Sequence, residues 1–327
     1  MFDFEKDCKV TITELLKKRF CKDTNLPIKI YSEPYFSHFL QLYDRQFNCI
    51  EKYKEFIRTV EFYGSEEKYL EAYNTLKDTV INYFNENEWM TFFARQEDFK
   101  KFGLQNVGFP TSSIFKVTNN NGFFVSIDMV KGNFTALHHY DKRIVGDKDS
   151  YEDFIRMFTD KKHFVESKYI RQVVFGNVNP RRQVTYEQFL MDKVLSKCFE
   201  YGIGRPFVEF FSADEIVLSV PNDMVSYGMI NSNFVEKIES VVDWAKSEGI
   251  NVRCEFFMLR AIEGTDGYMK IYQHNKSGVD FKCLNFLNFP FVLRKFYNED
   301  VQDNDRVFVY EGRLAKLVED VDVSVEI

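Results

Sequence analysis

Apolar side chains recur every three or four residues through the first part of the chain, which is the spacing of an amphipathic helix. One such stripe occupies residues 35–61, and a second follows the turn at Gly64–Ser65. The first consists of Phe36, Phe39, Leu40, Tyr43, Phe47, Ile50, Tyr53, Ile57 and Val60, and the second of Leu70, Tyr73, Leu76, Val80 and Tyr83. The pattern predicts one long helix over 35–61 and a mostly helical region over residues 1–110.

From residue 112 onward, short apolar runs bounded by turn residues replace the helical spacing, and such runs are typical of strands. SIFKVT, the turn NNNG and FFVSID predict a strand, a turn and a second strand. FVEFF, IVLSV, VRCEFFML and GYMKIY predict four more. Thr185 and Gln188 have the spacing of a capping box, which predicts a helix from Thr185 that ends before Gly202. Another helix is expected over 233–248, ended by Gly249.

This order of elements predicts an α+β fold in which helices lie on one face of a mainly antiparallel sheet. Three regions are expected: a helical N-terminal region over 1–110, a sheet domain over 111–275 and a small C-terminal extension over 276–327. The extension contains DVQDNDRVFVYEGRLAKLVED, which predicts a small hairpin or a strand, a turn and a helix.

Composition limits the function classes. The net charge of −7 argues against a protein coated in basic surface for bulk nucleic-acid binding, although it leaves room for a local basic groove. Six scattered cysteines without a CxxC pair are typical of reduced thiols, and no run of 18 or more apolar residues occurs. We therefore expect a soluble, cytoplasmic protein that does not enter a membrane. The 36 Phe and 18 Tyr, with many Asn and Lys, suit an AT-rich genome such as that of a phage, a large virus or a low-GC bacterium.

Two adjacent carboxylates, Asp214 and Glu215, stand in FFSADEIVLSV between two runs that read as buried strands. Such a pair repels itself unless a positive charge lies between the two groups, and a divalent metal is the usual candidate. A third carboxylate, Asp128, ends the strand FFVSID. If the two strands are neighbours, Asp128, Asp214 and Glu215 can share a metal, and carboxylate oxygen is the ligand that Mg²⁺ or Mn²⁺ prefers.

These two stretches carry a family resemblance. FFVSIDMVKGNFTAL resembles the first motif of the palm domain of right-handed polymerases, and FFSADEIVLSV resembles the third, the acidic hairpin of reverse transcriptases. The hairpin is also similar to that of diguanylate cyclases, whose second acid is Glu. The resemblance covers roughly 110–275 and implies a palm-like (ferredoxin/RRM-like) sheet, with Asp128, Asp214 and Glu215 as catalytic metal ligands. The Gly-Pro-Gln-Gly loop of reverse transcriptases is absent, as is the Gly-Gly that precedes the cyclase acids.

Palm chemistry also implies residues that bind the nucleotide. Lys131, just after Asp128, and Arg181 and Arg182 are the candidates for cradling a triphosphate. Backbone N–H groups of residues 131–134 at a helix start add an anion site. Asn133 or Phe134 is expected near the sugar.

The first hypothesis is thus a Mg²⁺-dependent nucleotidyltransferase of the palm type, reverse transcriptase-like, which joins or cyclises nucleotides from nucleoside triphosphates. The alternative is a catalytically silent palm-like module, encoded by a phage or virus, that binds nucleic acid or a host protein. A metal-dependent nuclease fits less well, because no His or Lys stands beside the acids as a base. Template dependence, DNA versus RNA and oligomeric state are not encoded in any motif.

Overall fold

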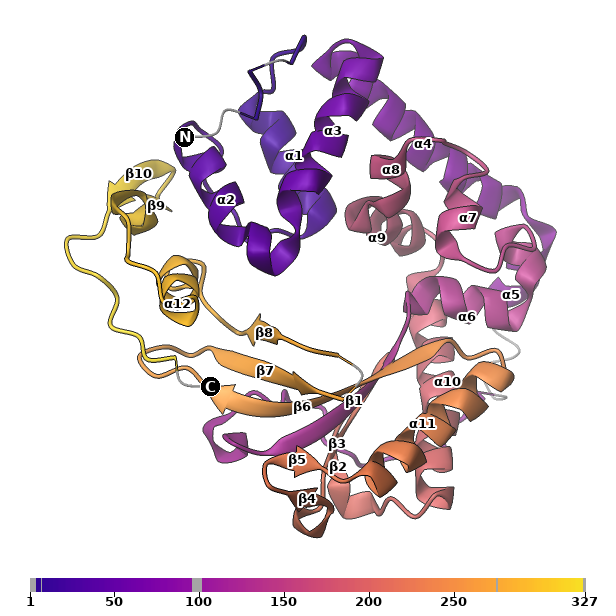
Figure 1. The fold of residues 1–327 in the computed structure, drawn as a ribbon. Coiled ribbons are helices and arrows are strands. Elements are labelled where there is room, and N and C mark those ends of the chain that lie inside the picture. Colours follow the sequence, from indigo (N-terminus) through magenta and orange to yellow (C-terminus); the bar gives the residue numbers. More distant parts are fainter. Residues whose placement is uncertain (1–3, 7, 96–101, 275, 326–327) are drawn as a thin grey trace.

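The computed structural model describes the chain except residues 1–3, 7, 96–101, 275 and 326–327 (Figure 1). The N-terminal region is helical, as predicted. Its helices are α1 (Glu14–Thr24), α2 (Tyr35–Phe47), α3 (Cys49–Tyr63), α4 (Glu66–Glu86) and α5 (Glu88–Ala94). The side chains of Thr13 and Ser65 cap α1 and α4 by accepting hydrogen bonds from backbone N–H groups of the first turn.

The single helix expected over 35–61 is wrong, because the chain breaks at Asn48. This residue has φ 47° and ψ 53°, a left-handed conformation that asparagine tolerates better than most residues. Asp44 stabilises the break, since its carboxylate accepts a hydrogen bond from the backbone N–H of Ile50 at 2.7 Å. The apolar spacing continues across Asn48, so periodicity could not reveal two helices.

Strands between residues 123 and 282 build a six-stranded antiparallel sheet in the order β2-β3-β1-β6-β7-β8. Its strands are β1 (Phe123–Met129), β2 (Val208–Phe211), β3 (Glu215–Ser219), β6 (Val252–Ala261), β7 (Tyr268–Gln273) and β8 (Val279–Lys282). All but β8 were predicted. A separate hairpin made of two short strands, β4 (Val225–Ser226) and β5 (Met229–Ile230), follows β3. The fold is therefore α+β, as the sequence indicated.

The strand expected at SIFKVT is wrong. Residues Val117–Asn119 form a short 3-10 helix, and β1 pairs with β3 and β6 instead. Ile114 is nevertheless buried, in a cluster with Phe124 and Phe257 of the sheet. Ile114 thus packs on a sheet face although the segment does not join the ladder, and Val117 is exposed. Apolar pattern alone cannot separate this arrangement from a strand.

The two faces of β1 are chemically different. Val125, Ile127 and Met129 belong to the main core, together with residues of α6 (Gly132–Tyr140), α10 (Pro180–Glu200) and α11 (Ser232–Ser247). Phe124, Ser126 and Asp128 point to the opposite face, because successive side chains of a strand alternate. Helix α10 packs against α6, α11 and β3, and α11 packs against β6.

Helix α10 begins at Pro180, five residues before the capping box that we expected at Thr185. The Thr185 hydroxyl instead donates a hydrogen bond to the Arg181 carbonyl at 2.9 Å. Proline at the first helical position was the better signal, because its missing N–H costs nothing there. Before α10 lie α7 (Tyr151–Ile155), α8 (Lys162–Glu166) and α9 (Lys168–Gly176).

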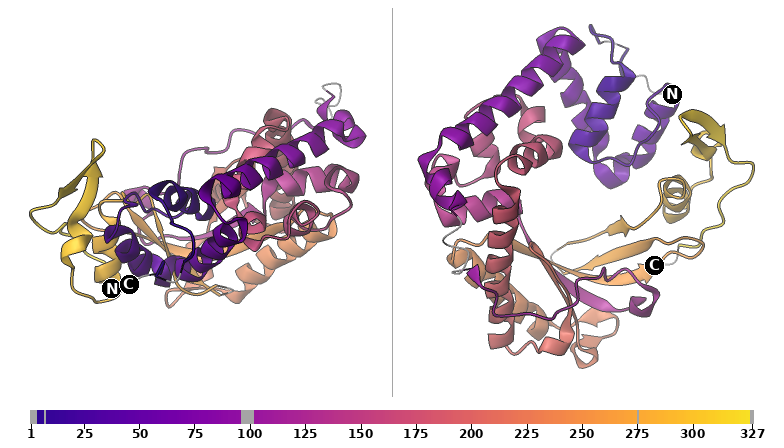
Figure 2. Two further views of the ribbon diagram at one scale, coloured as in Figure 1. Left: turned by 90° about the horizontal axis from the view of Figure 1, so that it is seen from above. Right: turned by 180° about the vertical axis from the view of Figure 1, so that it is seen from behind.

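The C-terminal part contains α12 (Phe289–Phe296), which was not predicted. It also contains the hairpin of β9 (Val307–Tyr310) and β10 (Arg313–Lys316), which is one of the two arrangements expected there. The strand β8 pairs with β7, so the sheet continues past the expected boundary at 275. Figures 1 and 2 show the chain closing into a ring, with the N-terminal helices opposite the sheet and the C-terminal hairpin beside α2.

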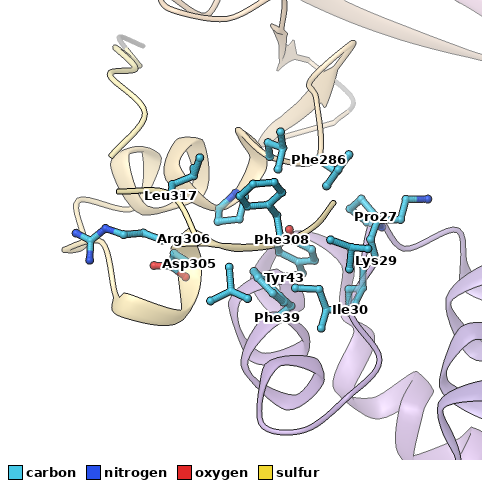
Figure 3. Close-up of a pocket in the computed structure, with 15 residues that line it drawn as sticks. Pro27, Lys29, Ile30, Phe39, Tyr43, Phe286, Asp305, Arg306, Phe308 and Leu317 are labelled. Atoms are coloured by element: carbon cyan, nitrogen blue, oxygen red, sulfur yellow. The ribbon is translucent and has the colours of Figure 1, made fainter. Parts of the chain in front are cut away.

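A buried ion-pair network joins the two ends of the ring. The Asp305 carboxylate lies 2.6 Å from His38 Nε2 on α2 and 2.9 Å from Arg294 Nε on α12. Burial acts to raise the pKa of Asp305, but hydrogen bonds from His38 and Arg294 outweigh it and hold this pKa below its ordinary value. Beside the network is a small pocket lined by residues from both ends of the chain, including Phe39, Tyr43 and Phe308 (Figure 3).

Across the part of the chain that the structure describes, no helix combines the length and the apolar character needed to span a bilayer.

Candidate functional site

The ladder of the sheet brings the predicted acids together. In the register of β1 with β3, Asp128 stands directly opposite Glu215. The backbone N–H of Met129 also donates a hydrogen bond to the Asp214 carbonyl at 2.8 Å. Two strand ends that lie 86 residues apart in the sequence therefore meet on neighbouring central strands, as expected.

Ser212 shapes the acidic turn between β2 and β3. Its hydroxyl donates to Asp214 Oδ1 at 3.1 Å and accepts from the backbone N–H of Glu215 at 3.1 Å. The backbone N–H of Ser212 donates to the Glu215 carbonyl at 2.9 Å, which closes the turn. This is the serine that replaces one of the two cyclase glycines, so the turn is held by a side chain rather than by glycine flexibility.

The acids are partly withdrawn from water. Burial raises the pKa of Asp128, and the nearby Arg253 offsets part of this effect. Burial likewise raises the pKa of Glu215, and Lys270 acts in the opposite direction. The negative charges of Asp214 and Glu255 add to the increase for both groups. The site therefore favours binding of a proton or another cation.

Sequence reasoning missed a fourth acid, Glu187 of α10. Its side chain is 5% exposed and accepts a hydrogen bond from Asn133 Nδ2 at 3.0 Å. Burial, and then the charge of Asp214, raise the pKa of Glu187 to about 7. A signal did exist: Glu187 precedes Leu190, Met191 and Val194 by three, four and seven residues, so it lies on the buried stripe of its helix.

Arg253 is a second residue that the sequence did not reveal. It stands opposite Asp128 in the register of β1 with β6. Its Nε and Nη2 atoms lie 3.1 Å and 2.9 Å from Asp128 Oδ2. A guanidinium group therefore holds the carboxylate that we expected to bind a metal.

Two of the predicted nucleotide-binding residues, Lys131 and Asn133, lie at the start of α6, just after β1. Lys131 has φ 51° and ψ 57°, forms an ion pair with Glu152, and lies 5.5 Å from the centre of the Tyr151 ring. Asn133 holds Glu187, as described above. Of these two residues, only Asn133 contacts an acid of the site, because the ammonium group of Lys131 is paired with Glu152.

The other three candidates have different surroundings. Phe134 is 5% exposed and stacks on His138 at 5.8 Å between ring centres, so the structure places it in the core rather than at a surface for a sugar. Arg182 is 1% exposed, and its guanidinium lies 5.3 Å from the ring centres of both Phe93 and Phe102. An arginine in that position does not reach a phosphate in solvent. Arg181 is exposed on the first turn of α10.

The residue types at this site suit Mg²⁺ or Mn²⁺, but their arrangement does not form a metal centre. Within the described residues, no group of three or more His, Cys, Asp or Glu side chains is placed to hold a metal ion. Asp128 already has a cation, Arg253, on one oxygen. The expected metal ligands are therefore adjacent without being assembled.

Comparisons with protein-family models, with curated proteins and with solved structures give no match for this chain.

Proposed function

We propose that this chain is a nucleotidyltransferase of the palm type, which joins or cyclises nucleotides from nucleoside triphosphates with Mg²⁺ or Mn²⁺. One observation carries the proposal: Asp128 and the acidic hairpin occupy directly paired positions on adjacent central strands of an antiparallel sheet. Carboxylates of this kind bind the hard cations that, in palm enzymes, stabilise the attacking oxygen and the departing pyrophosphate.

Other residues of the site have roles that suit this reaction. Lys131, three residues after Asp128 in the sequence, is the proposed contact for the phosphates of a nucleotide, and in the free protein its ammonium group pairs with Glu152. Asn133 orients Glu187, whose pKa of about 7 lets it hold or release a proton near neutral pH. Arg181, exposed at the start of α10, remains a candidate phosphate contact.

A second candidate is a catalytically silent palm-like module, encoded by a phage or virus, that binds nucleic acid or a host protein. The observation that favours it is the ion pair between Asp128 and Arg253, together with the absence, among the residues described, of an assembled metal group. Arg253 in that case neutralises an acid that has no metal to bind.

The test is pyrophosphate release from labelled nucleoside triphosphates with Mn²⁺, with and without primed templates. Asp128→Asn should lower the rate by at least about 100-fold, because it removes the charge that the reaction needs. Asp243→Asn, an exposed site on α11, is the matched control and should leave the rate unchanged. Wild-type protein that consumes no nucleotide under any condition, yet binds nucleic acid or a partner tightly, would establish the silent module instead.

A further inference from the structure

Three strands present one charged row across the face of the sheet that bears Asp128. Side chains in directly paired positions share a face, so the row reads Glu215, Asp128, Arg253 from β3 through β1 to β6. The guanidinium of Arg253 contacts Asp128 Oδ2 through two nitrogen atoms, at 3.1 Å and 2.9 Å. The central acid of the row is thus bound on one side by an arginine and has an acid on the other.

Arg253 is committed to this acid and not to the next one along its strand. Glu255 faces the same way as Arg253, but Lys270 lies 3.2 Å and Lys276 3.0 Å from its carboxylate. Those two cations satisfy Glu255, and their effect is visible as a pKa of about 2 for this group, despite its burial. Arg253 therefore pairs with Asp128 on β1, the strand next to the acidic hairpin, and not with Glu255.

Arg253 can leave Asp128 without disturbing the core. Its side chain is 60% exposed, whereas that of Asp128 is 29% exposed. A rotation of the arginine into solvent breaks this pair, whose arginine is exposed and whose acid is half-buried, and exposed pairs stabilise a protein by about 0.2–1 kcal/mol. A doubly charged cation can displace an ion pair this weak. The pair is nevertheless strong enough to reduce the affinity of that cation for Asp128.

We propose that Arg253 is the internal counter-ion of Asp128 in the free protein and competes with divalent cations for its carboxylate. The ion pair takes the place of the metal at the central acid, which explains why acids of the right type meet here without an assembled metal centre. Arg253 contacts Oδ2 of this carboxylate, and a metal ion on either oxygen would be repelled by the guanidinium a few ångströms away, so the two cations weaken each other's binding to Asp128. This inference rests on the metal-dependent part of the proposed function.

The experiment is a titration of the full chain with Mn²⁺, in which free Mn²⁺ is followed by electron paramagnetic resonance without any nucleotide. Arg253→Gln should bind Mn²⁺ about two- to fivefold more tightly than the wild type, the factor that corresponds to an exposed ion pair. Arg253→Lys keeps a cation beside Asp128 and should stay close to the wild type. Arg306→Gln breaks an arginine pair with Asp320, at 2.6 Å, in the C-terminal part and is the matched control.

A double-mutant cycle identifies the partner. In Asp128→Asn protein, Arg253→Gln should no longer raise the affinity for Mn²⁺, because the carboxylate for which Arg253 and Mn²⁺ compete is gone. Equal Mn²⁺ affinity of wild type and Arg253→Gln, weaker binding by Arg253→Gln, or no Mn²⁺ binding by either protein would overturn the proposal. Tighter binding by Arg253→Gln in a protein that consumes no nucleotide would keep this inference and reject the proposed enzyme, so the two failures are distinguishable.

Discussion

Replacement of Glu187 by glutamine should make this protein more stable at neutral and alkaline pH. Glu187 is 5% exposed, and the Asn133 side chain donates a hydrogen bond to its Oε1 atom at 3.0 Å. Burial, followed by the negative charge of Asp214, raises the pKa of Glu187 from 4.5 to about 7. Glutamine has nearly the same shape and keeps an oxygen that accepts the same hydrogen bond, but it never ionises.

The magnitude follows from the difference in pKa between the folded and unfolded chains. An increase from 4.5 to about 7, at ~1.4 kcal/mol for each pH unit, lowers the free energy of unfolding by about 3 kcal/mol once the group is ionised. Between these two pH values the unfolded chain loses the proton while the folded chain keeps it. Stability is therefore lost as the pH rises from 4.5 to about 7, and the loss is constant above that.

The assay is urea unfolding of the wild type and Glu187→Gln at pH 5 and pH 8. We expect a difference below about 1 kcal/mol at pH 5 and a gain of about 3 kcal/mol for Glu187→Gln at pH 8. Glu236→Gln, an exposed position on α11, should change neither value. A Glu187→Gln protein that is less stable than the wild type at pH 8, or that differs equally at both pH values, would refute this account of the buried acid.

Two further predictions concern the C-terminal part of the chain. Asp305→Ala should lower the free energy of unfolding in urea by about 1–3 kcal/mol at pH 7, because it removes the buried partner of His38 and leaves the guanidinium of Arg294 with Glu299 as its carboxylate partner. Since the folded state holds the pKa of Asp305 low, this difference should shrink as the pH falls through that pKa, and an unchanged difference would contradict the prediction. Gly264→Ala should lower the thermal unfolding midpoint by several degrees, because φ is +78° there and a Cβ atom would collide with the Asp322 carbonyl. Gly312→Ala, with φ +76° and open space around it, is the control. It should lower the free energy of unfolding by only about 1–2 kcal/mol, and the thermal unfolding midpoint by less than Gly264→Ala does. An equal decrease of the midpoint at both sites would argue against the collision.

The regular elements of this fold follow from the apolar pattern wherever that pattern has a single structural meaning. The strands β1, β2, β3, β6 and β7 and the helix α11 lie where alternation and helical spacing placed them. The errors arose where two structures share one pattern. Asn48 interrupts a helical stripe without shifting its phase. Ile114 packs on a sheet face as a strand residue would, but residues 113–118 form no ladder.

The site was predictable only where it depended on chain order. Asp128 and Asp214 stand at ends of strands that were recognisable, so their meeting followed from topology. Arg253 was not predictable in the same way. It lies 125 residues from Asp128, and its role depends on the register of β1 with β6, which a shift of one residue would have abolished.

Glu187 gives a reason to favour the enzyme over the silent module. A carboxylate buried at a helix core position beside another acid lowers stability by about 3 kcal/mol at neutral pH, and glutamine would keep the contact with Asn133 without that cost. Packing therefore does not explain the residue, and buried acids with raised pKa values are concentrated at functional sites.

Arg253 acts in the opposite sense, since it removes part of the repulsion among the acids. In a catalytically silent module, Arg253 would stabilise the fold, whereas Glu187 would only destabilise it. The presence of both residues is consistent with a site whose negative charge is partly neutralised when it is free and that can accept a cation with its substrate. If Glu187→Gln abolishes nucleotide consumption while it raises stability, the glutamate is there for the reaction. If Glu187→Gln raises stability and leaves every activity and binding property intact, this argument for the enzyme fails.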